Sequence, residues 1–95
     1  MPARELDRIA RSEIEAAGLG EYFLHSLGHG LGLQVHERPK ISPLSREELQ
    51  AGNVVTIEPG LYLPTVGGVR IEDDVLITDA GCKLLSHLNR ELQVV

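Results

Sequence analysis

Three of the four histidines in this chain of 95 residues fall in one short stretch, HSLGHGLGLQVH, residues 25–36. His25, His29 and His36 follow one another at intervals of four and seven residues, with glycines between them. Imidazole nitrogens combined with carboxylates form a ligand set for Mn, Fe, Co or Zn ions, and glycine lets backbone and substrate approach a ligand closely. The stretch therefore indicates part of a metal-hydrolase site.

Carboxylates that could complete the ligand set lie on two predicted strands, residues 53–58 and 69–77. If these strands pair antiparallel with Glu58 opposite Glu72, their apolar faces coincide and Arg70 shares the face of the carboxylates. Like charges directly opposite one another destabilise a sheet unless a positive charge lies between them, and a divalent cation would serve. The alternative is that both glutamates are ordinary solvent-facing strand residues.

The other reactive side chains also have ordinary structural explanations. His25 could be a core histidine whose hydrogen bonds are satisfied, and His36, beside Glu37, could belong to a surface loop. His87 lies in the C-terminal tail and is expected to be structural or exposed. Cys82 is expected to be a small buried hydrophobic residue rather than a nucleophile.

The composition excludes several classes of protein. A net charge of −5 argues against nucleic-acid binding, because no basic stripe is available to neutralise phosphates. One cysteine excludes an internal disulfide framework and fits a reducing compartment. The charged N-terminus resembles neither a signal peptide nor a membrane span. These features predict a soluble, cytoplasmic protein of one small domain, with no nucleic acid and no membrane as partner.

The spacing of apolar residues predicts one main helix, over residues 3–17, that ends at Gly18. Short helical turns are expected to begin at Ser45, where Glu48 completes a capping box, and to end at Gly52. The remaining segments are expected to be glycine-rich turns and extended chain at 22–37, a loop at 38–43, and strands at 53–58, 69–77 and 82–86. The fold class is therefore α+β, with one main helix packed against a small antiparallel sheet.

Three motifs follow one another along the chain: HSLGHGLGLQVHERP at 25–39, TIEPGLY at 56–62 and GGVRIEDDVLIT at 67–78. Together they closely resemble the C-terminal part of Xaa-Pro aminopeptidases and prolidases (Xaa-Pro dipeptidases). These enzymes belong to the pita-bread metallopeptidase family, which also includes methionine aminopeptidase. The resemblance covers essentially the whole chain and implies part of a pita-bread fold. The two histidines that flank the GHG sequence favour the Xaa-Pro branch of the family.

The resemblance implies a site built around two divalent metal ions. It assigns His29, Glu58 and Glu72 as metal ligands, with Glu72 as the carboxylate that bridges the two ions. Manganese is favoured because the ligand set is rich in glutamate, and cobalt or zinc is also compatible with it. Family members use two further aspartate ligands on preceding strands, to which this chain has no counterpart. We therefore expect residues 1–95 to be the C-terminal half of a metallopeptidase catalytic domain, without an internal boundary.

The same resemblance assigns His25, His36 and Arg70 to catalysis. The two histidines would contact substrate and stabilise charge, and the arginine would lie close to the metal centre. The complete protein is then expected to hydrolyse the Xaa-Pro bond of a proline-containing peptide, as an aminopeptidase or a dipeptidase, with a water activated by two metal ions. The chain alone is expected to be inactive and to bind one metal ion weakly or none.

A second hypothesis is a non-catalytic module derived from the same family, which binds peptide or metal or associates with itself. A half-sheet taken from a larger fold would leave an unpaired strand edge, which favours a homodimer or a domain-swapped oligomer. The missing aspartates are the feature that distinguishes the two hypotheses, since they are needed for the enzyme and not for the module.

Overall fold

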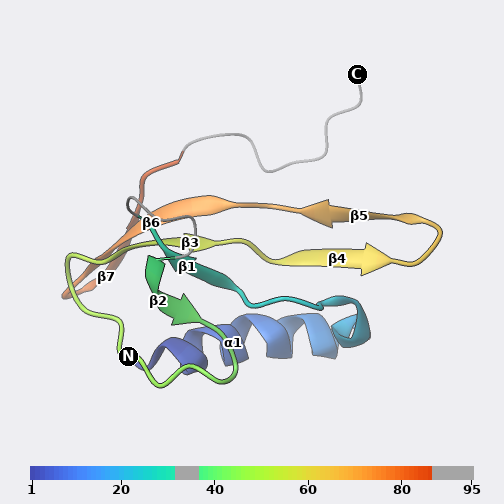
Figure 1. Ribbon diagram of the computed structural model, residues 1–95, viewed down its shortest axis with the longest axis horizontal. Helices are drawn as coiled ribbons and strands as arrows, with labels where there is room; N and C mark the ends of the chain where they lie inside the picture. Colours follow the sequence, from blue (N-terminus) through green and yellow to red (C-terminus); the bar gives the residue numbers. More distant parts are fainter. Residues whose placement is uncertain (32–36, 87–95) are drawn as a thin grey trace.

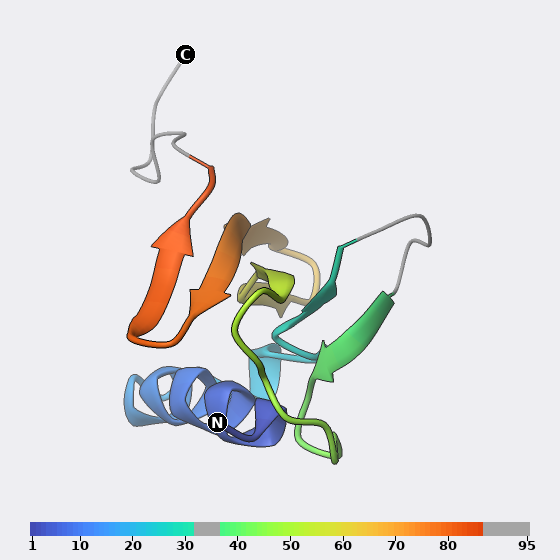
Figure 2. The ribbon, with the colours of Figure 1, turned by 90° about the vertical axis from the view of Figure 1, so that its left-hand side faces the viewer.

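The computed structural model describes residues 1–31 and 37–86 and has one layer of helix against one layer of sheet. The elements in these residues are α1 (Ala3–Ala16), the short 3₁₀-helix η1 (Gly20–Tyr22), β1 (Gly28–Gly30), β2 (Glu37–Ile41), β3 (Val54–Ile57), β4 (Gly60–Leu63), β5 (Gly67–Arg70), β6 (Asp73–Thr78) and β7 (Gly81–Leu84). Five strands form an antiparallel sheet in the order β2-β1-β3-β6-β7, and β4 pairs with β5 alone. Helix α1 runs along one face of this sheet, and the β4–β5 hairpin projects beyond it (Figure 1, Figure 2). Neither helix in the described part of the chain is long and apolar enough to cross a membrane.

Helix α1 forms and ends where the sequence predicts. Its apolar residues share the face that packs on the core: Ala3, Leu6, Ala10 and Ile14. The chain leaves the helix through Gly18, whose φ of +79° is easily adopted by glycine and disfavoured for other residues. The amide of Gly18 donates to the carbonyl of Glu15 (2.9 Å), and that of Leu19 donates to Ile14 (3.1 Å). This pair of hydrogen bonds is a Schellman motif, which satisfies carbonyls that the helix end would otherwise leave unpaired.

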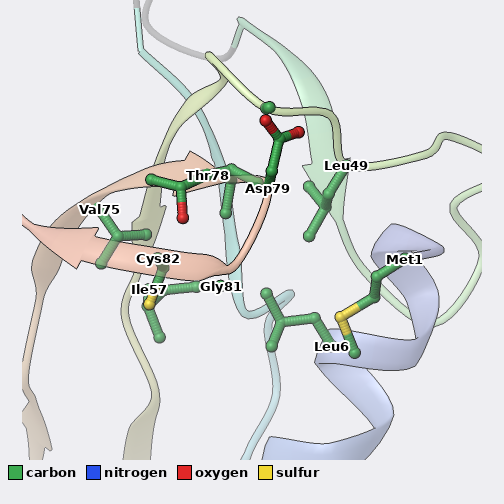
Figure 3. Close-up of a pocket in the computed structure, with 11 residues that line it drawn as sticks. Met1, Leu6, Leu49, Ile57, Val75, Thr78, Asp79, Gly81 and Cys82 are labelled. Carbon is green, nitrogen blue, oxygen red and sulfur yellow. The ribbon is translucent and has the colours of Figure 1, made fainter.

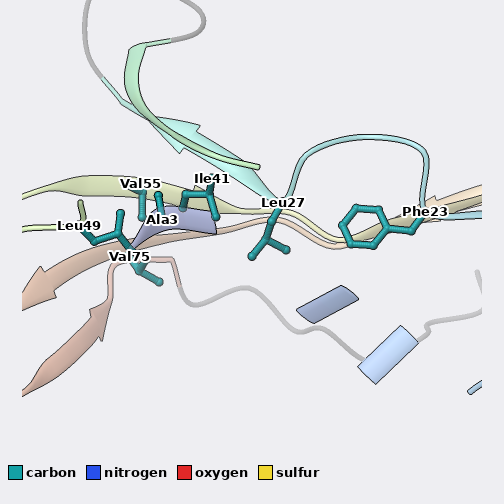
Figure 4. Close-up of a cluster of buried hydrophobic side chains, with 7 residues drawn as sticks. All are labelled: Ala3, Phe23, Leu27, Ile41, Leu49, Val55 and Val75. Carbon is teal, nitrogen blue, oxygen red and sulfur yellow. The ribbon is translucent and has the colours of Figure 1, made fainter. Parts of the chain in front are cut away.

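The hydrophobic core lies between α1 and the sheet (Figure 4). Its buried members are Ala3, Phe23, Leu27, Ile41, Leu49, Val55 and Val75. Three of these, Leu27, Ile41 and Val55, come from the residue before β1, from β2 and from β3. Burial of their apolar surface therefore holds together the strands that carry the candidate site residues.

Strand β1 lies between β2 and β3 and approaches β3 very closely. A Cβ atom added at Gly28 would lie 1.8 Å from the carbonyl oxygen of Thr56, so only glycine fits at this position. The next amide, that of His29, donates to Thr56 Oγ1 (3.1 Å). The glycines of the histidine motif thus bring His29 beside the strand that leads into Glu58.

The register of the long hairpin agrees with the sequence prediction. In the β3–β6 pair Thr56 lies opposite Asp74, and in the β4–β5 pair Gly60 lies opposite Arg70. The same register on both sides confirms the predicted alignment around residue 58. Between the two ladders, however, residues 58–59 and 71–72 belong to no strand.

This interruption and the pairing of β2 account for the errors in the predicted strands. The predicted strand 69–77 is two strands, β5 and β6, because residues 71–72 leave the ladder between them. The segment 38–43, predicted to be a loop, forms most of β2 because its backbone pairs with β1. Strand β4 is not anticipated by the sequence analysis, whereas β3 and β7 lie where strands are predicted.

The helical turns predicted after Ser45 do not form within residues 45–52. The backbone there forms hydrogen bonds with the start of the chain instead. The amide of Ala3 donates to the carbonyl of Glu47 (2.9 Å), and the amide of Leu49 donates to the carbonyl of Met1 (2.8 Å). Groups used in these long-range hydrogen bonds cannot also serve a local helix. The capping prediction was therefore overridden by a tertiary contact.

An apolar hollow of about 560 Å³ lies between the start of α1 and the β6–β7 hairpin (Figure 3). Met1, Leu6, Ile77 and Cys82 are among the residues that line it. Cys82 is exposed, so the prediction of a buried cysteine is wrong. The reason is that β7 is an edge strand of the sheet and is exposed along its whole length.

The side chain of Glu47 forms hydrogen bonds that link β2 to the segment after it. One carboxylate oxygen accepts a hydrogen bond from the Lys40 amide (2.9 Å), and the other binds the Arg38 guanidinium. These contacts, the Lys40 amide first, lower the pKa of Glu47 below its ordinary value. The ionised carboxylate therefore stabilises the folded state.

We expect Leu27→Ala to lower the free energy of unfolding by about 2–4 kcal/mol, because it empties a fully buried position in the core. Leu44→Ala is the matched control: Leu44 is 91% exposed, and its truncation should change that free energy by less than about 0.5 kcal/mol. Urea unfolding followed by circular dichroism measures both effects. Similar losses in the two variants would contradict this assignment of the core.

Glu47→Gln should destabilise the protein at neutral pH and lose that effect in acid. Because the folded pKa lies below the unfolded one, the stabilisation is complete above the unfolded value of about 4.3 and disappears as the pH falls through the folded value. The exposed Glu13 on α1 supplies the control variant Glu13→Gln, which should resemble the native chain at both pH values. Urea midpoints near neutral pH and well below the unfolded pKa test this, and a gap that does not shrink in acid would refute it.

Candidate metal centre

A polar pocket of about 380 Å³ opens beside the interruption of the long hairpin. It is lined by His25, Ser26, Gly28, His29, Lys40, Glu58 and Arg70. Four of the six predicted site residues, from separate parts of the sequence, thus line one pocket. The segment before β1, β1 itself, the residue after β3 and the end of β5 bring them there.

Glu58 lies at the centre of this group. Its Oε2 is 3.3 Å from Nε2 of His29, and its Oε1 is 3.5 Å from Nη1 of Arg70. The side chains of His29 and Glu58 are only 20% and 13% exposed. Electrostatic interactions between such partly buried groups are less screened by water than those at the surface. Arg70, whose guanidinium also lies 5.7 Å from the centre of the Tyr62 ring, supplies a fixed positive charge at the pocket.

The imidazole of His29 is oriented by the backbone beside it. Its Nδ1 lies 2.9 Å from the carbonyl oxygen of Gly30. Because a carbonyl only accepts, Nδ1 carries the proton, and in the neutral ring Nε2 then presents its lone pair. This lone pair faces the carboxylate oxygen of Glu58. Two acceptors that face one another in this way repel unless a proton or a cation lies between them.

The facing atoms of His29 and Glu58 fit a divalent cation. Ligand atoms held about 2.1 Å from a metal, with about 90–110° between them, lie about 3.0–3.4 Å apart, and the observed separation is 3.3 Å. Glu58 Oε2 is also buried and accepts no hydrogen bond from the residues that the structure describes. A buried oxygen of this kind needs an explanation, and a metal-ligand position supplies one.

Glu72, the third predicted ligand, is not brought into this group. Its side chain is exposed and does not line the pocket. Among the described residues no three His, Cys, Asp or Glu side chains lie together so that they could hold a metal ion. The register of the hairpin is as predicted and is kept across the interruption, where the amide of Ile71 donates to the carbonyl of Pro59 (3.2 Å). The pairing of the Glu58 and Glu72 carboxylates across the hairpin stays a prediction.

His25 is neither a surface residue nor a core histidine with satisfied hydrogen bonds. The rings of Phe23 and Tyr62 approach its imidazole edge-on, with centroids 5.0 and 5.8 Å away. Its Nδ1 lies 2.7 Å from the carbonyl of Ser26, so Nδ1 donates and Nε2 keeps the lone pair. Nε2 is buried and has no hydrogen-bond partner within residues 1–31 and 37–86. An orphaned nitrogen in a polar pocket is suited to contact with a substrate.

His36, the remaining predicted catalytic residue, lies outside the described residues. Two residues of the site were missed by the sequence analysis. Thr56, which binds the His29 amide, shares a strand face with Glu58, so the alternation of side chains could have revealed it. Lys40 lies opposite His29 in the sheet and lines the pocket, but its segment is predicted to be a loop, so no sequence signal indicated it.

Comparison with known proteins agrees with this geometry. Residues 1–79 match the metallopeptidase family M24. The chain belongs to this family. It is 58% identical over 92 residues to an Xaa-Pro dipeptidase of Pyrococcus furiosus, covering 97% of this chain and 26% of that protein. The chain thus spans about a quarter of the length of this relative.

Solved structures show the same relationship. An Xaa-Pro dipeptidase from Bacillus anthracis superposes with a TM-score of 0.96 at 44% identity, over 100% of this chain and 27% of that one. An X-Pro aminopeptidase from Thermotoga maritima gives a TM-score of 0.94 at 46% identity, over 100% and 27%. The expected α+β class and pita-bread fold are confirmed. Membership of a metallopeptidase family implies divalent metal ions, without specifying which metal.

We expect M24-type metal binding in this chain to depend on His29 and Glu58 and not on Glu72. His29→Ala and Glu58→Gln should each weaken Mn²⁺ binding by about tenfold or more, because each removes one of the two facing ligand atoms. The exposed Glu72 supplies the control, Glu72→Gln, which should leave the affinity nearly unchanged. Titration of free Mn²⁺ by electron paramagnetic resonance measures the affinity. A comparable loss in the Glu72 variant would make Glu72 a ligand after all.

Proposed function

We propose that this chain supplies part of the active site of a metal-dependent peptidase that hydrolyses the Xaa-Pro bond, as an aminopeptidase or a dipeptidase. The observation that carries the proposal is the partly buried contact between His29 Nε2 and Glu58 Oε2, 3.3 Å apart. The names of the relatives, which include an Xaa-Pro dipeptidase and an X-Pro aminopeptidase, support the same substrate class. Residues 1–95 would then be the C-terminal half of the catalytic domain.

In the proposed site His29 and Glu58 bind a cation, and Arg70 orients Glu58. When bound, two divalent cations, most simply Mn²⁺, would activate a shared water and polarise the scissile carbonyl. Arg70 holds Oε1 of Glu58 and so keeps Oε2 toward His29. Glu72 is proposed as the third ligand from the motif and from its register position opposite Glu58.

His25 and His36 would act on the substrate rather than on the metal. Cleavage of an Xaa-Pro bond develops negative charge on the carbonyl oxygen and requires a proton on the leaving imino nitrogen. Nδ1 of His25 is held by the Ser26 carbonyl, so Nε2 is the atom that would exchange a hydrogen bond or a proton with substrate. The role of His36 is proposed from the motif alone.

Positive charge at the pocket favours a short substrate. Lys40 and Arg70 line the same pocket as His25 and Glu58, and the side chains of both cations reach solvent. A carboxylate one residue beyond the scissile bond, as in an Xaa-Pro dipeptide, would find these charges within the site. Within the proposed function, this supports a dipeptidase over an aminopeptidase that acts on longer peptides.

The alternative is a non-catalytic module that associates with itself or binds metal or peptide. Strand β7 is an edge of the sheet formed by residues 1–31 and 37–86 and is exposed over its length, so a second copy could pair with it. A homodimer or domain-swapped oligomer is proposed on this ground for the isolated chain, which we expect to lack activity. A cytoplasmic location also remains a prediction.

A chimera tests the function. This chain would replace the matching quarter of the Pyrococcus furiosus Xaa-Pro dipeptidase, to which it is 58% identical. We expect the purified chain alone to release no proline from an Xaa-Pro dipeptide in excess Mn²⁺, and the chimera to do so. In the chimera His25→Ala should lower kcat by about 10²-fold or more while metal content is retained, and His29→Ala should lose metal.

Three outcomes would each contradict one part of the proposal. A chimera that folds and binds metal but cleaves no Xaa-Pro peptide would rule out the proposed chemistry. Turnover by the chain alone, abolished by His29→Ala so that a contaminating peptidase is excluded, would show that the site is complete without further ligands. A chimera that prefers Xaa-Pro-Yaa tripeptides to dipeptides would overturn the argument from Lys40 and Arg70.

A further inference from the structure

A charged side chain lies on the apolar face of α1. Asp7 is completely buried, with 0% of the residue exposed, among the residues that pack on the sheet. Its two carboxylate oxygens accept hydrogen bonds from Nε and Nη2 of Arg11, one turn later, at 2.9 and 3.2 Å. Burying a carboxylate is costly unless it is paired and fully hydrogen-bonded, so its presence in a small core calls for an explanation.

The partners of this ion pair lie in the segment that carries His25. Nη1 of Arg11 donates to the carbonyl of Phe23 (3.0 Å), and Nη2 donates to the carbonyl of His25 (3.0 Å). The amide of Leu27 is shared between the carbonyl of Ile41 (2.9 Å) and Oδ2 of Asp7 (3.1 Å). The pair thus binds three backbone groups of a segment of five residues that contains no helix or strand.

The guanidinium also controls the packing of the His25 ring. It stacks over the ring of Phe23, with Cζ 4.2 Å from the ring centre. The Phe23 ring in turn approaches the His25 imidazole edge-on at 5.0 Å. The Arg11 side chain therefore contacts both the backbone carbonyl of His25 and the Phe23 ring that packs against the His25 imidazole.

We propose that Asp7 and Arg11 are positioning residues for His25. Asp7 fixes the planar guanidinium from the helix side, and Arg11 spreads its remaining donors across the two carbonyls of the loop. Arginine has five donors in a rigid fork, whereas lysine has a single ammonium on a flexible stem, so lysine could keep the ion pair but not this geometry. The importance of His25 to catalysis rests on the proposed function; its positioning by Arg11 does not.

The same helix supplies a matched control. Arg8 pairs with Glu5 one turn away, in an exposed ion pair whose side chains contact no loop residue in the interactions described for them. Arg8→Ala therefore removes an arginine and an intrahelical ion pair from α1 without touching the segment at residues 23–27. Exposed pairs of this kind contribute little to stability.

The experiment compares Arg11→Ala, Arg11→Lys and Arg8→Ala in the chain of 95 residues by nuclear magnetic resonance. The imidazole signals of His25, assigned with His25→Gln, report where the ring lies relative to Phe23 and Tyr62, and urea midpoints report overall stability. We expect Arg11→Lys to be nearer to the native chain in stability than Arg11→Ala is, yet to shift the His25 signals as far as Arg11→Ala does. Arg8→Ala should change neither readout.

A folded Arg11→Lys variant with native His25 signals would overturn the proposal, since Arg11 would then be only a structural partner of Asp7. If both Arg11 variants unfold, the native chain is measured instead. We expect nuclear Overhauser contacts between the guanidinium protons of Arg11 and the residues Phe23 and His25. Their absence would refute the assignment. None of these measurements depends on peptidase activity. An inactive chimera would therefore not contradict the positioning of His25 by Arg11. Native His25 signals in Arg11→Lys would likewise not contradict the proposed peptidase function.

Discussion

The close approach of β1 to β3 is the constraint on which the site depends. Gly28 lies so near the Thr56 carbonyl that any side chain there would collide with it. Because of this contact, the amide of His29 reaches Thr56 Oγ1 and its imidazole reaches Glu58 across the sheet. The glycines of the histidine motif are therefore needed for backbone proximity, and the chemistry follows from that proximity.

Neighbouring groups orient the polar side chains of the pocket. Backbone carbonyls hold Nδ1 of both His25 and His29, which directs the lone pair of each Nε2 away from the backbone. Arg70 occupies one oxygen of Glu58 and leaves the other toward His29. His29 Nε2 and Glu58 Oε2 are thereby brought to 3.3 Å from one another, a separation that suits two ligands of one cation.

The interrupted hairpin explains both what the chain can do and what it lacks. Glu58 leaves the ladder yet stays in the pocket, because the Leu27 carbonyl accepts its amide (2.8 Å) and Arg70 binds its side chain. Glu72 has no such partner among the described contacts and turns to solvent. The chain spans about a quarter of the length of its Pyrococcus furiosus relative.

The sequence by itself determined the α+β class, the extent of α1, the register of the long hairpin and four of the residues that line the pocket. These depend on periodicity, on glycine at Gly18 and on motifs, all of which are local or periodic signals. Only the tertiary structure decided that residues 38–41 form a strand, that the capped turn at Ser45 does not form, and that Glu72 lies outside the pocket. The first two depend on which distant backbone group takes a given hydrogen bond: β1 pairs with β2, and the start of the chain binds residues 47–49. The burial of Asp7 is of the same kind, because a carboxylate in an apolar stripe is acceptable only when a loop sixteen residues away supplies its partners, as the amide of Leu27 and the carbonyls bound by Arg11 do.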